Sequence, residues 1–493
     1  MTAALNGETA LASGDELQRQ RRGNPIRRFW RRAYTAPILP ASAKKPSSLI
    51  YSADDRPSSV VALSNGVQHV GLISINLVYP LLICRAVDAP ISLVADLLSI
   101  GMIVLSIGTL MQVLRLGPVG SGYMLPSTFT ASYFAPGLIA ARLGGLPLVF
   151  GMTIFAGALE AFVAPMLNRL RKFLPVEVSG LVIFMLGIAA GLAGLRTLLG
   201  PTATPVSSAE WLVAATTLGT MTALNIWGRG LVRMLCALIG LILGYAVAAT
   251  AGLMNPALWA LVSQADWVGI PHFAHVSYSF NATLVAPFAI ASLAAAMKAA
   301  GTLAICEKMN DANWVRPNMR SVTRGVLSDG LATMIAGFAG TAGGVNTSTP
   351  SAGLASATGV ASRSIAVVAA AIFLLLGFCP KLTALLAIMP RAVVVSALMY
   401  AVTFIMINGL QVMMSRMLDA RRTFVLGFGI LGGLAMEVFP KSVNLMPSEI
   451  AAVAGSSLVA STAIALILNF VFRLGVRKAA TLSFPREQID PQR

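Results

Sequence analysis

The sequence predicts an all-α polytopic membrane protein of about fourteen transmembrane spans, built as two seven-span halves. Three observations predict this fold. Hydrophobic residues make up 56% of the 493 residues and charged residues only 11%, against about 25% charged in a soluble domain. The apolar runs reach the length of about 20 residues that a helix needs to cross a bilayer. Finally, the third run of each half is interrupted by Gly, Pro, Ser and Thr.

The spans follow the apolar runs in order. Those of the first half are predicted near residues 61–84, 91–115, 123–140, 147–167, 176–198, 211–227 and 231–253. Those of the second half are predicted near residues 282–306, 324–342, 343–358, 364–387, 391–410, 422–438 and 449–473. Because each half has an odd number of spans, the two halves are expected to be inverted relative to each other in the membrane.

The third and tenth spans are predicted to be broken. The stretch from Gly343 to Gly353 contains Gly, Ser, Thr and a central proline, and these residues weaken or interrupt a helix. Backbone that leaves a helix at membrane depth survives where it is buried in protein or lines a cavity. A plain surface loop is the alternative. Corresponding broken spans in two halves instead indicate an inverted repeat with a binding site near the middle of the membrane.

The charge distribution predicts the topology. The net charge is +17, and the positive side chains gather in the tails and at the ends of apolar runs, whereas the connection 254–281 contains no Lys or Arg. Positive connections are typical of the cytoplasmic side. We therefore expect a basic cytoplasmic tail lying on anionic lipid, with no nucleic-acid partner. The predicted parts are the N-terminal tail 1–58, the first repeat 59–253, the external loop 254–281, the second repeat 282–473 and the cytoplasmic C-terminal tail 474–493.

No cofactor or metal is predicted. The four cysteines are widely spaced without a CxxC pair. His272 and His275 could bind a metal but lack further ligands, so surface histidines are the favoured interpretation. The sequence has no phosphate-binding loop of the GK[ST] type, which disfavours an ATP-driven pump. Coupling to H+ or Na+ stays open.

With the two breaks placed, three motifs carry a resemblance. Gln68-His69 lies in the first span, and the stretch from Arg324 to Gly330 opens the ninth. The tenth contains Pro350-Ser351-Ala352-Gly353, followed by Ala357-Thr358-Gly359-Val360-Ala361-Ser362-Arg363. Together they resemble the nucleobase–ascorbate transporter family, also called the xanthine/uracil permeases, from about Val61 to about Arg473.

The resemblance implies a specific architecture. A core domain would hold the substrate, and a gate domain of spans five to seven and twelve to fourteen would pack against it. Short antiparallel strands would interrupt spans three and ten, and half-helices would follow them. The N-terminal ends of these half-helices offer unpaired N–H donors and partial positive charge toward a bound base. The resemblance also suggests a homodimer.

Three positions depart from the family pattern. In the eighth span the family has Glu-x-x-Gly-Asp, whereas this sequence has Lys298 at the glutamate position and Thr302 at the aspartate position. In the tenth span Ser351 replaces the usual asparagine. In the family the glutamate binds ring N–H groups and takes part in proton coupling. A charged lysine only donates hydrogen bonds.

Lys298 therefore has several interpretations. It could pair with an anionic substrate, load and release a proton itself, or stand in place of a bound cation. It could also be structural, snorkelling toward the membrane surface or paired with Asp329 or Glu160. Ionisable residues inside a membrane are functional by default, which favours the first group of interpretations.

The candidate site residues come from the breaks and from the eighth span. The candidates for substrate binding are Gln68, Phe129, Tyr133, Lys298, Thr302, Pro350, Ser351 and Gly353. The ring of Phe129 or of Tyr133 could stack on a base, and Thr130 and Ser132 could offer hydroxyl groups. The candidates for coupling or structural support are His69, Asp329 and Glu160.

The leading hypothesis is a secondary active transporter of the inner membrane. Its solute would be a nucleobase-like or related planar molecule, neutral or anionic, moved by alternating access with probable ion coupling. An organic or inorganic anion transporter or exchanger on the same fold is the alternative. A membrane-embedded enzyme is disfavoured because His69, the one histidine inside a span, has no nearby acid in the sequence. A channel is disfavoured by the two broken spans.

Overall fold

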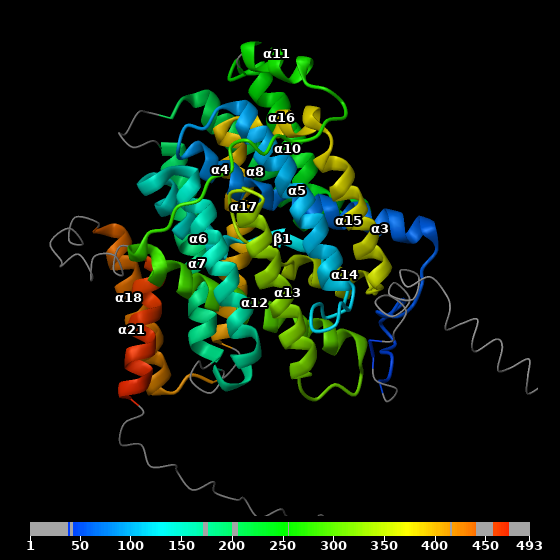
Figure 1. Ribbon diagram of the computed structural model, residues 1–493, viewed down its shortest axis with the longest axis vertical. Coiled ribbons are helices and arrows are strands. Elements are labelled where there is room, and N and C mark those ends of the chain that lie inside the picture. The colour runs from blue at the N-terminus through cyan, green and yellow to red at the C-terminus, as the bar shows by residue number, and fades with distance from the viewer. Residues whose placement is uncertain are drawn as a thin grey trace, which may run out of the picture.

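The computed structural model describes residues 38–39, 43–170, 176–199, 206–254, 256–414, 417–439 and 457–472. Most of the predicted N-terminal tail and all of the predicted C-terminal tail lie outside these ranges. The described part is mostly helical, with the helices standing roughly along the long axis in Figure 1.

The elements follow the predicted spans closely. Those of the first half are α3 (Ser59–Ser74), η1 (Ile75–Leu77), α4 (Val78–Arg85), α5 (Ile91–Val113), β1 (Ser127–Phe129), η2 (Ala131–Tyr133), α6 (Phe134–Leu170), α7 (Val176–Leu199), α8 (Ser208–Trp227), α9 (Gly230–Met234) and α10 (Cys236–Thr250). After α11 (Pro256–Gln264) come η3 (Ala282–Leu284), α12 (Val285–Asn310), α13 (Met319–Phe338), β2 (Val345–Thr347), α14 (Thr349–Thr358), α15 (Arg363–Gly377), α16 (Pro380–Ala387), α17 (Arg391–Met413), α18 (Ala420–Val438) and α21 (Ser457–Val471).

Six of the described helices are long and apolar enough to cross a membrane. A seventh crossing is added if α15 and α16, which meet at a bend of 81°, count as one span. The chain is therefore a multi-pass membrane protein. The other predicted segments contain shorter or less apolar helices, so the count of fourteen spans stays a prediction.

The helix α6 is two helices joined by a kink. Gly144 and Gly145 leave helical geometry, and Gly145 has φ +67°, a conformation that glycine adopts without steric cost. The segment from Phe134 to the kink is thus a short helix that starts directly after β1 and η2. The longer second part carries Glu160 back through the protein.

The two predicted breaks meet in space. β1 and β2 form an antiparallel pair in which Ser127 lies opposite Thr347 and Phe129 opposite Val345. Two further backbone hydrogen bonds extend the pair, from Thr130 N–H to the Gly344 carbonyl and from Ser348 N–H to the Pro126 carbonyl. Segments separated by more than 200 residues in the sequence therefore share one small sheet, which lies among the helices in Figure 1.

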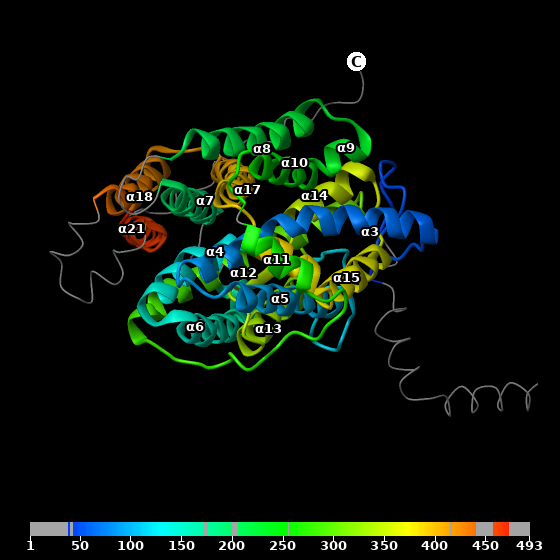
Figure 2. The same ribbon diagram turned by 90° about the horizontal axis from the view of Figure 1, so that it is seen from above.

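The helices form two groups that lie side by side in Figure 2. In one group α17 packs on α7, α21 on α18, and α10 on α8. In the other α13 packs on α6, and α15 on α5 and α3. The strand pair belongs to the second group, because β1 contacts α5 and β2 contacts α13.

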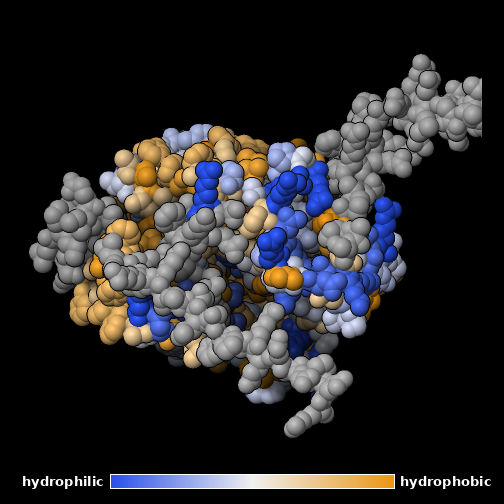
Figure 3. All heavy atoms as spheres, turned by 90° about the horizontal axis from the view of Figure 1, so that it is seen from below, coloured by the Kyte–Doolittle hydropathy of each residue, from blue (hydrophilic) through white to orange (hydrophobic). Residues whose placement is uncertain are grey.

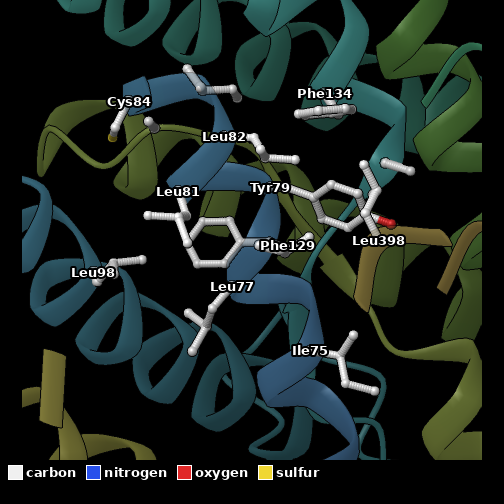
Figure 4. Close-up of a cluster of buried hydrophobic side chains, with 14 of the residues drawn as sticks. Ile75, Leu77, Tyr79, Leu81, Leu82, Cys84, Leu98, Phe129, Phe134 and Leu398 are labelled. Carbon is white, nitrogen blue, oxygen red and sulfur yellow. The ribbon is translucent and has the colours of Figure 1, made fainter. Parts of the chain in front are cut away.

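The largest apolar core lies where α4, α5 and the start of α6 meet. Figure 4 shows Phe129 between Leu77, Leu81 and Leu98. Tyr79 packs against Phe134, with 5.3 Å between the ring centroids. Burial of these large side chains stabilises the positions of β1 and η2.

Residues 43–57, the N-terminal segment, bind the ends of three helices. Tyr51 forms a parallel bridge with Val360 in the connection between α14 and α15. The N–H of Ala53 donates to the side chain of Asn310 at the end of α12, at 2.8 Å. The carboxylate of Asp54 pairs with Arg363 at the start of α15, at 2.5 Å. The segment thus ties the ends of α12 and α14 to the start of α15.

One face of the molecule is rich in hydrophilic residues. Figure 3 shows this face from below, with hydrophilic side chains beside hydrophobic surface. The connection between α12 and α13 lies at the lower end of Figure 1. The exposed basic residues there are Arg316 in the connection, Lys308 at the end of α12 and Arg320 at the start of α13. Basic connections on one side are typical of a cytoplasmic face. The orientation in the membrane stays a prediction.

Candidate functional site

Two helix N-termini point toward the strand pair. Thr130 caps η2 by accepting from the N–H of Ser132, and the short first part of α6 follows. Ser348 caps α14 by accepting from the N–H of Ser351. The first turn of a helix leaves N–H groups without an intrahelical partner and carries partial positive charge. Each break therefore ends in a set of hydrogen-bond donors.

Glu160 on α6 hydrogen-bonds to residues of both breaks. Its carboxylate accepts a hydrogen bond of 2.7 Å from the Tyr133 hydroxyl in η2. It accepts a second, of 3.2 Å, from the side-chain amide of Asn346 in β2. The same amide also donates to the Ala295 carbonyl of α12, at 3.1 Å. One fully buried acid on α6 thus contacts both halves of the strand region.

Asp329 and Thr333 on α13 fix β2. One carboxylate oxygen of Asp329 accepts from the Thr347 N–H at 3.0 Å. The Thr333 hydroxyl donates to the Val345 carbonyl at 2.6 Å and accepts from the Val345 N–H at 3.0 Å. β2 has a single strand partner, so these contacts pair backbone groups that the sheet leaves unpaired.

Glu160 and Asp329 lie near each other because α6 and α13 cross at glycines. A Cβ on Gly157 would lie 2.6 Å from the Gly330 carbonyl oxygen, and one on Gly330 would lie 2.5 Å from the Ala161 nitrogen. Small residues let membrane helices approach to backbone contact. The crossing therefore brings two fully buried acids to neighbouring positions.

Gly344 makes room for Tyr133. A Cβ at this position would lie 2.0 Å from Cδ2 of the Tyr133 ring, far inside van der Waals contact. The ring therefore lies directly over the backbone of the second break. This placement aims the Tyr133 hydroxyl at Glu160.

Lys298 lies on α12 between the acids and the first break. Its Nζ is 3.5 Å from the Thr130 hydroxyl, a long and weak contact. Asp329 and Glu160 are the two acids whose charges act on the ammonium, but in the described chain neither lies within 4.0 Å of it. The side chain is partly exposed. Lys298 is thus near both acids while keeping its donors available.

One side of this cluster is open. The Thr302 and Thr349 hydroxyls are 2.7 Å apart and join α12 to the first turn of α14. Beside them Pro350, Gly353 and Gly301 are exposed, and a Cβ on either glycine would meet no atom within 4 Å. A solute that approaches from this side would meet Lys298, Thr349 and the start of α14, whereas Thr302, a predicted substrate-binding residue, is buried beside Thr349.

A family model described as Permease family, that of the xanthine and uracil permeases, matches residues 61–442. The chain belongs to the xanthine/uracil permease family. The permease is similar to the xanthine permease XanQ of Escherichia coli, with 26% identity over 458 residues that cover 88% of this chain and 96% of XanQ. It is also similar to the nucleobase transporter PlUacP of Paenibacillus larvae, with 25% identity over 429 residues, 86% of this chain and 96% of the relative. The permease is therefore a transporter and not an enzyme.

Solved structures support the fold. The transmembrane domain of the cyanobacterial bicarbonate transporter BicA matches with a TM-score of 0.53 at 15% identity, covering 84% of this chain and 98% of that domain. The murine anion transporter Slc26a9 matches with a TM-score of 0.54 at 11% identity, covering 85% of this chain and 69% of that one. At such low identity the likeness shows the architecture of a membrane transporter.

Some predicted site residues lie away from the open side of the permease. Phe129 is buried between apolar side chains, and its ring faces Gly101 of α5. Gln68 and His69 are buried on α3, and no described residue hydrogen-bonds the His69 ring nitrogens or the Gln68 carbonyl oxygen. Their proposed roles in binding or relay stay predictions. Ser351 is also buried; its N–H donates to Ser348, and its hydroxyl has no partner in the described part of the chain.

Two residues of the site had no role predicted from the sequence. Asn346 donates to Glu160, and Thr349 pairs with Thr302. Both lie in the Gly/Ser/Thr stretch that indicated the break, which marked the region but not these two residues within it. Among the described residues no group of three or more His, Cys, Asp or Glu is placed to hold a metal ion.

Proposed function

We propose that this permease is a secondary active transporter that moves a nucleobase or a related planar solute across the inner membrane. The observation that carries the proposal is the site on the open side, made by the Lys298 ammonium, the Thr349 hydroxyl and the start of α14. The relatives include nucleobase and xanthine permeases. The site contains Pro350 and Gly353, which belong to the family motif of the tenth span.

The chemistry of the site favours a solute with an acceptor edge. The ammonium of Lys298 only donates, and the threonine hydroxyls can donate or accept. The start of α14 adds mainly the partial positive charge of a helix N-terminus, because Pro350 has no N–H and the N–H groups of Ser351 and Ala352 already bond to Ser348. A planar base presents carbonyl oxygens and ring nitrogens that such donors satisfy. A base that has lost a ring proton, or another planar anion, would gain a charge-assisted bond from Lys298.

The architecture that we propose has fourteen spans in two inverted repeats. The group that contains α5, α6, α12 and α13 would be the core domain, and the group that contains α7, α17 and α21 would be the gate. Movement of one group against the other would give alternating access. Both termini would be cytoplasmic, and the protein would form a homodimer, as the family resemblance suggests. The basic tail would rest on anionic lipid.

A second candidate function is transport or exchange of a smaller organic or inorganic anion. Lys298 is the specific observation in its favour, because an ammonium next to a helix N-terminus forms an anion site without any need for a planar ring.

Uptake into proteoliposomes tests both candidates. We would measure uptake of radiolabelled xanthine, uracil, hypoxanthine and urate, and of ascorbate, bicarbonate and sulfate, under imposed H+ or Na+ gradients. Saturable uptake of a base with no uptake of the inorganic anions supports the first candidate. Uptake of inorganic anions alone supports the second candidate. Uptake of none of these solutes would contradict both candidates.

Lys298→Ala tests the role of the ammonium. Loss of a charged hydrogen bond costs about 1.5–3 kcal/mol, so KM for the transported solute should rise by about 10- to 150-fold. Lys308→Ala is the matched control, because Lys308 is exposed at the far end of the same helix. An unchanged KM in Lys298→Ala would remove Lys298 from the binding site. Lys298→Glu should favour solutes that present N–H groups over anions.

A further inference from the structure

Glu160 is the one described acidic side chain that contacts both breaks. Tyr133 of η2 and Asn346 of β2 both donate to it, and the side chain is fully buried. No cation lies within ion-pair distance of it in the described part of the chain. Burial of an ionised carboxylate without such a partner carries a large free-energy penalty. A permanently ionised Glu160 would therefore be costly in this position.

The charges around Glu160 do not balance. The titratable groups that face it are Tyr133 from η2, Lys298 from α12 and Asp329 from α13. Ser292 of α12 and Asn346 of β2 add neutral polar groups. Two carboxylates and one ammonium leave one negative charge if all three are ionised. Since net charge inside a membrane protein is costly, the cluster favours binding of one proton.

The hydrogen-bond partners distinguish the two acids. Asp329 accepts from the Thr347 backbone N–H, which can only donate. Glu160 accepts from the Tyr133 hydroxyl, which can donate to a carboxylate or accept from a carboxylic acid. Asp329 is also the acid whose charge acts most strongly on Lys298. Asp329 is thus suited to stay ionised beside Lys298, and Glu160 to exist in both forms.

We propose that Glu160 is the residue that binds and releases the coupling proton, and that Tyr133 and Asn346 are positioning residues that connect it to the two breaks. This inference rests on the proposed transport function. A proton from water would bond to the Glu160 oxygen that faces Tyr133. The Tyr133 hydroxyl would keep its own hydrogen and change from donor to acceptor, and Lys298 would stay an ammonium throughout.

This arrangement links the solute to the proton. A solute that accepts a hydrogen bond from Lys298 partly neutralises the positive charge that acts on Glu160 and Asp329. The ammonium then stabilises the ionised carboxylates less, so solute binding favours protonation of Glu160. By reciprocity, protonation of Glu160 favours solute binding by the same factor.

The first test needs no substrate. Infrared spectra of the purified full-length protein would be recorded between acidic and alkaline pH, and the C=O stretch of a protonated buried carboxyl would be followed. We expect a titrating band in the wild type that disappears in Glu160→Gln. In Asp329→Asn the band should remain but titrate at lower pH, because one carboxylate and one ammonium then balance. Tyr133→Phe should shift the band without removing it, because it deletes only the hydrogen-bond partner. A band that survives in Glu160→Gln would overturn the assignment.

The second test measures coupling in proteoliposomes, with [14C]xanthine and [14C]uracil as probes. Glutamine imitates the protonated acid, so Glu160→Gln should retain solute counterflow without a gradient. Accumulation driven by a proton gradient should be lost, because a carrier that no longer binds the proton only equilibrates the solute across the membrane. Accumulation at the wild-type level in Glu160→Gln would overturn the proposal.

The two tests separate the possible failures. If the wild type transports neither probe but the infrared band behaves as expected, the substrate assignment fails and Glu160 still binds the proton. If the wild type transports a probe and the band is absent or independent of Glu160, the proton assignment fails alone. Tyr133→Phe retains the carboxyl group, so it keeps the infrared test decisive even if Glu160→Gln does not fold.

Discussion

At the scale of single residues, the notable feature is where the acid of the site comes from. The family pattern places a glutamate on the helix equivalent to α12, and this chain has Lys298 there. The nearest carboxylates come from neighbouring helices instead, Glu160 on α6 and Asp329 on α13. An amine on one helix and acids on two others keep a polar cluster in this region. In the proposed site, the group that would face a solute is therefore positive and not negative.

The hydroxyl pair of Thr302 and Thr349 gives a prediction at this scale. Each substitution to valine keeps the side-chain shape and removes one partner of the 2.7 Å contact. Each single variant should lower the free energy of unfolding by about 0.5–1.5 kcal/mol. Equilibrium unfolding in detergent of both single variants and the double variant would measure this. Because the bond between the two hydroxyls can be lost only once, the double variant should lose less than the sum, even though Thr302→Val also removes the bond to the Lys298 carbonyl; strict additivity would contradict a stabilising pair.

Sequence reasoning found part of this cluster and missed the rest for a physical reason. Lys298, Glu160 and Asp329 could be selected because a charge in an apolar run is rare and costly. Asn346 and Thr349 lie in a stretch where most residues are polar, so polarity did not distinguish them. Their roles depend on which face of β2 or α14 each side chain occupies. That face follows from the register of β2 against β1 and from the start of α14, which the residue spacing in the sequence does not give.

At the scale of elements, the strand pair joins the two halves and sets the direction of both half-helices. β1 is buried on all sides and paired along one edge with β2. The other contacts come from α5 and α13, including the bond from Ser127 N–H to the Thr109 hydroxyl at 2.9 Å. A short two-stranded sheet is not stable by itself in water, so these helices stabilise it.

The close approach of Gly344 to Tyr133 gives a prediction for this element. The methyl group of Gly344→Ala would overlap the Tyr133 ring, so the ring or β2 must shift and the bond to Glu160 should be lost. Overpacking of this kind costs about 1–3 kcal/mol, and thermal unfolding in detergent would measure it. Gly427→Ala is the control, because a Cβ at this position in α18 meets no atom within 4 Å. Equal stability of the two variants would contradict the packing argument.

Both breaks could be predicted from the sequence, because Gly and Pro weaken a helix whatever its tertiary contacts. The predicted spans 123–140 and 147–167 were separated by a short connection, and α6 leaves helical geometry there, at Gly144 and Gly145. The choice of partner for β1 followed from the family resemblance and not from the residues themselves.

At the scale of the whole molecule, the N-terminal segment 43–57 is part of the helix assembly. Its contacts reach Asn310, Val360 and Arg363, which lie in the second half of the chain. The prediction of a tail extending to residue 58 therefore needs a correction at its end. Residues 43–57 make specific backbone pairs and ion pairs, because they cover the polar ends of α12 and α14.

The ion pair between Arg363 and Asp54 gives a prediction at this scale. The Arg363 side chain is largely buried, so Arg363→Ala should cost about 1.5–3 kcal/mol. It should also expose the N-terminal segment to limited proteolysis in membranes. Lys45→Ala is the matched control: its pair with Asp55 is well exposed on both sides and should contribute little. Cleavage at equal rates in both variants would contradict the role of Arg363.

Acid should weaken the same segment. Burial alone would raise the pKa of Asp55, but hydrogen bonds from Lys45 and Ser52 outweigh it and lower that pKa. The stabilisation is therefore fully present above the pKa of an unfolded aspartate, about 3.9, and is lost as the pH falls through the lower folded value. Proteolysis of the segment by an acid-stable protease should increase only in that range, chiefly through loss of the part-buried bond from the Ser52 N–H, because the exposed pair with Lys45 contributes little.

The N-terminal segment also has a consequence for the order of synthesis. Its backbone partner Val360 and its ion-pair partner Arg363 are made about 300 residues later. β1 likewise has no strand partner until β2 is made. During translation, the first half must therefore remain in the membrane with its polar break unpaired until α13, β2 and α14 emerge. A chain that stops before residue 345 would insert its early helices but leave the solute site unbuilt, and quality-control proteases could detect that state.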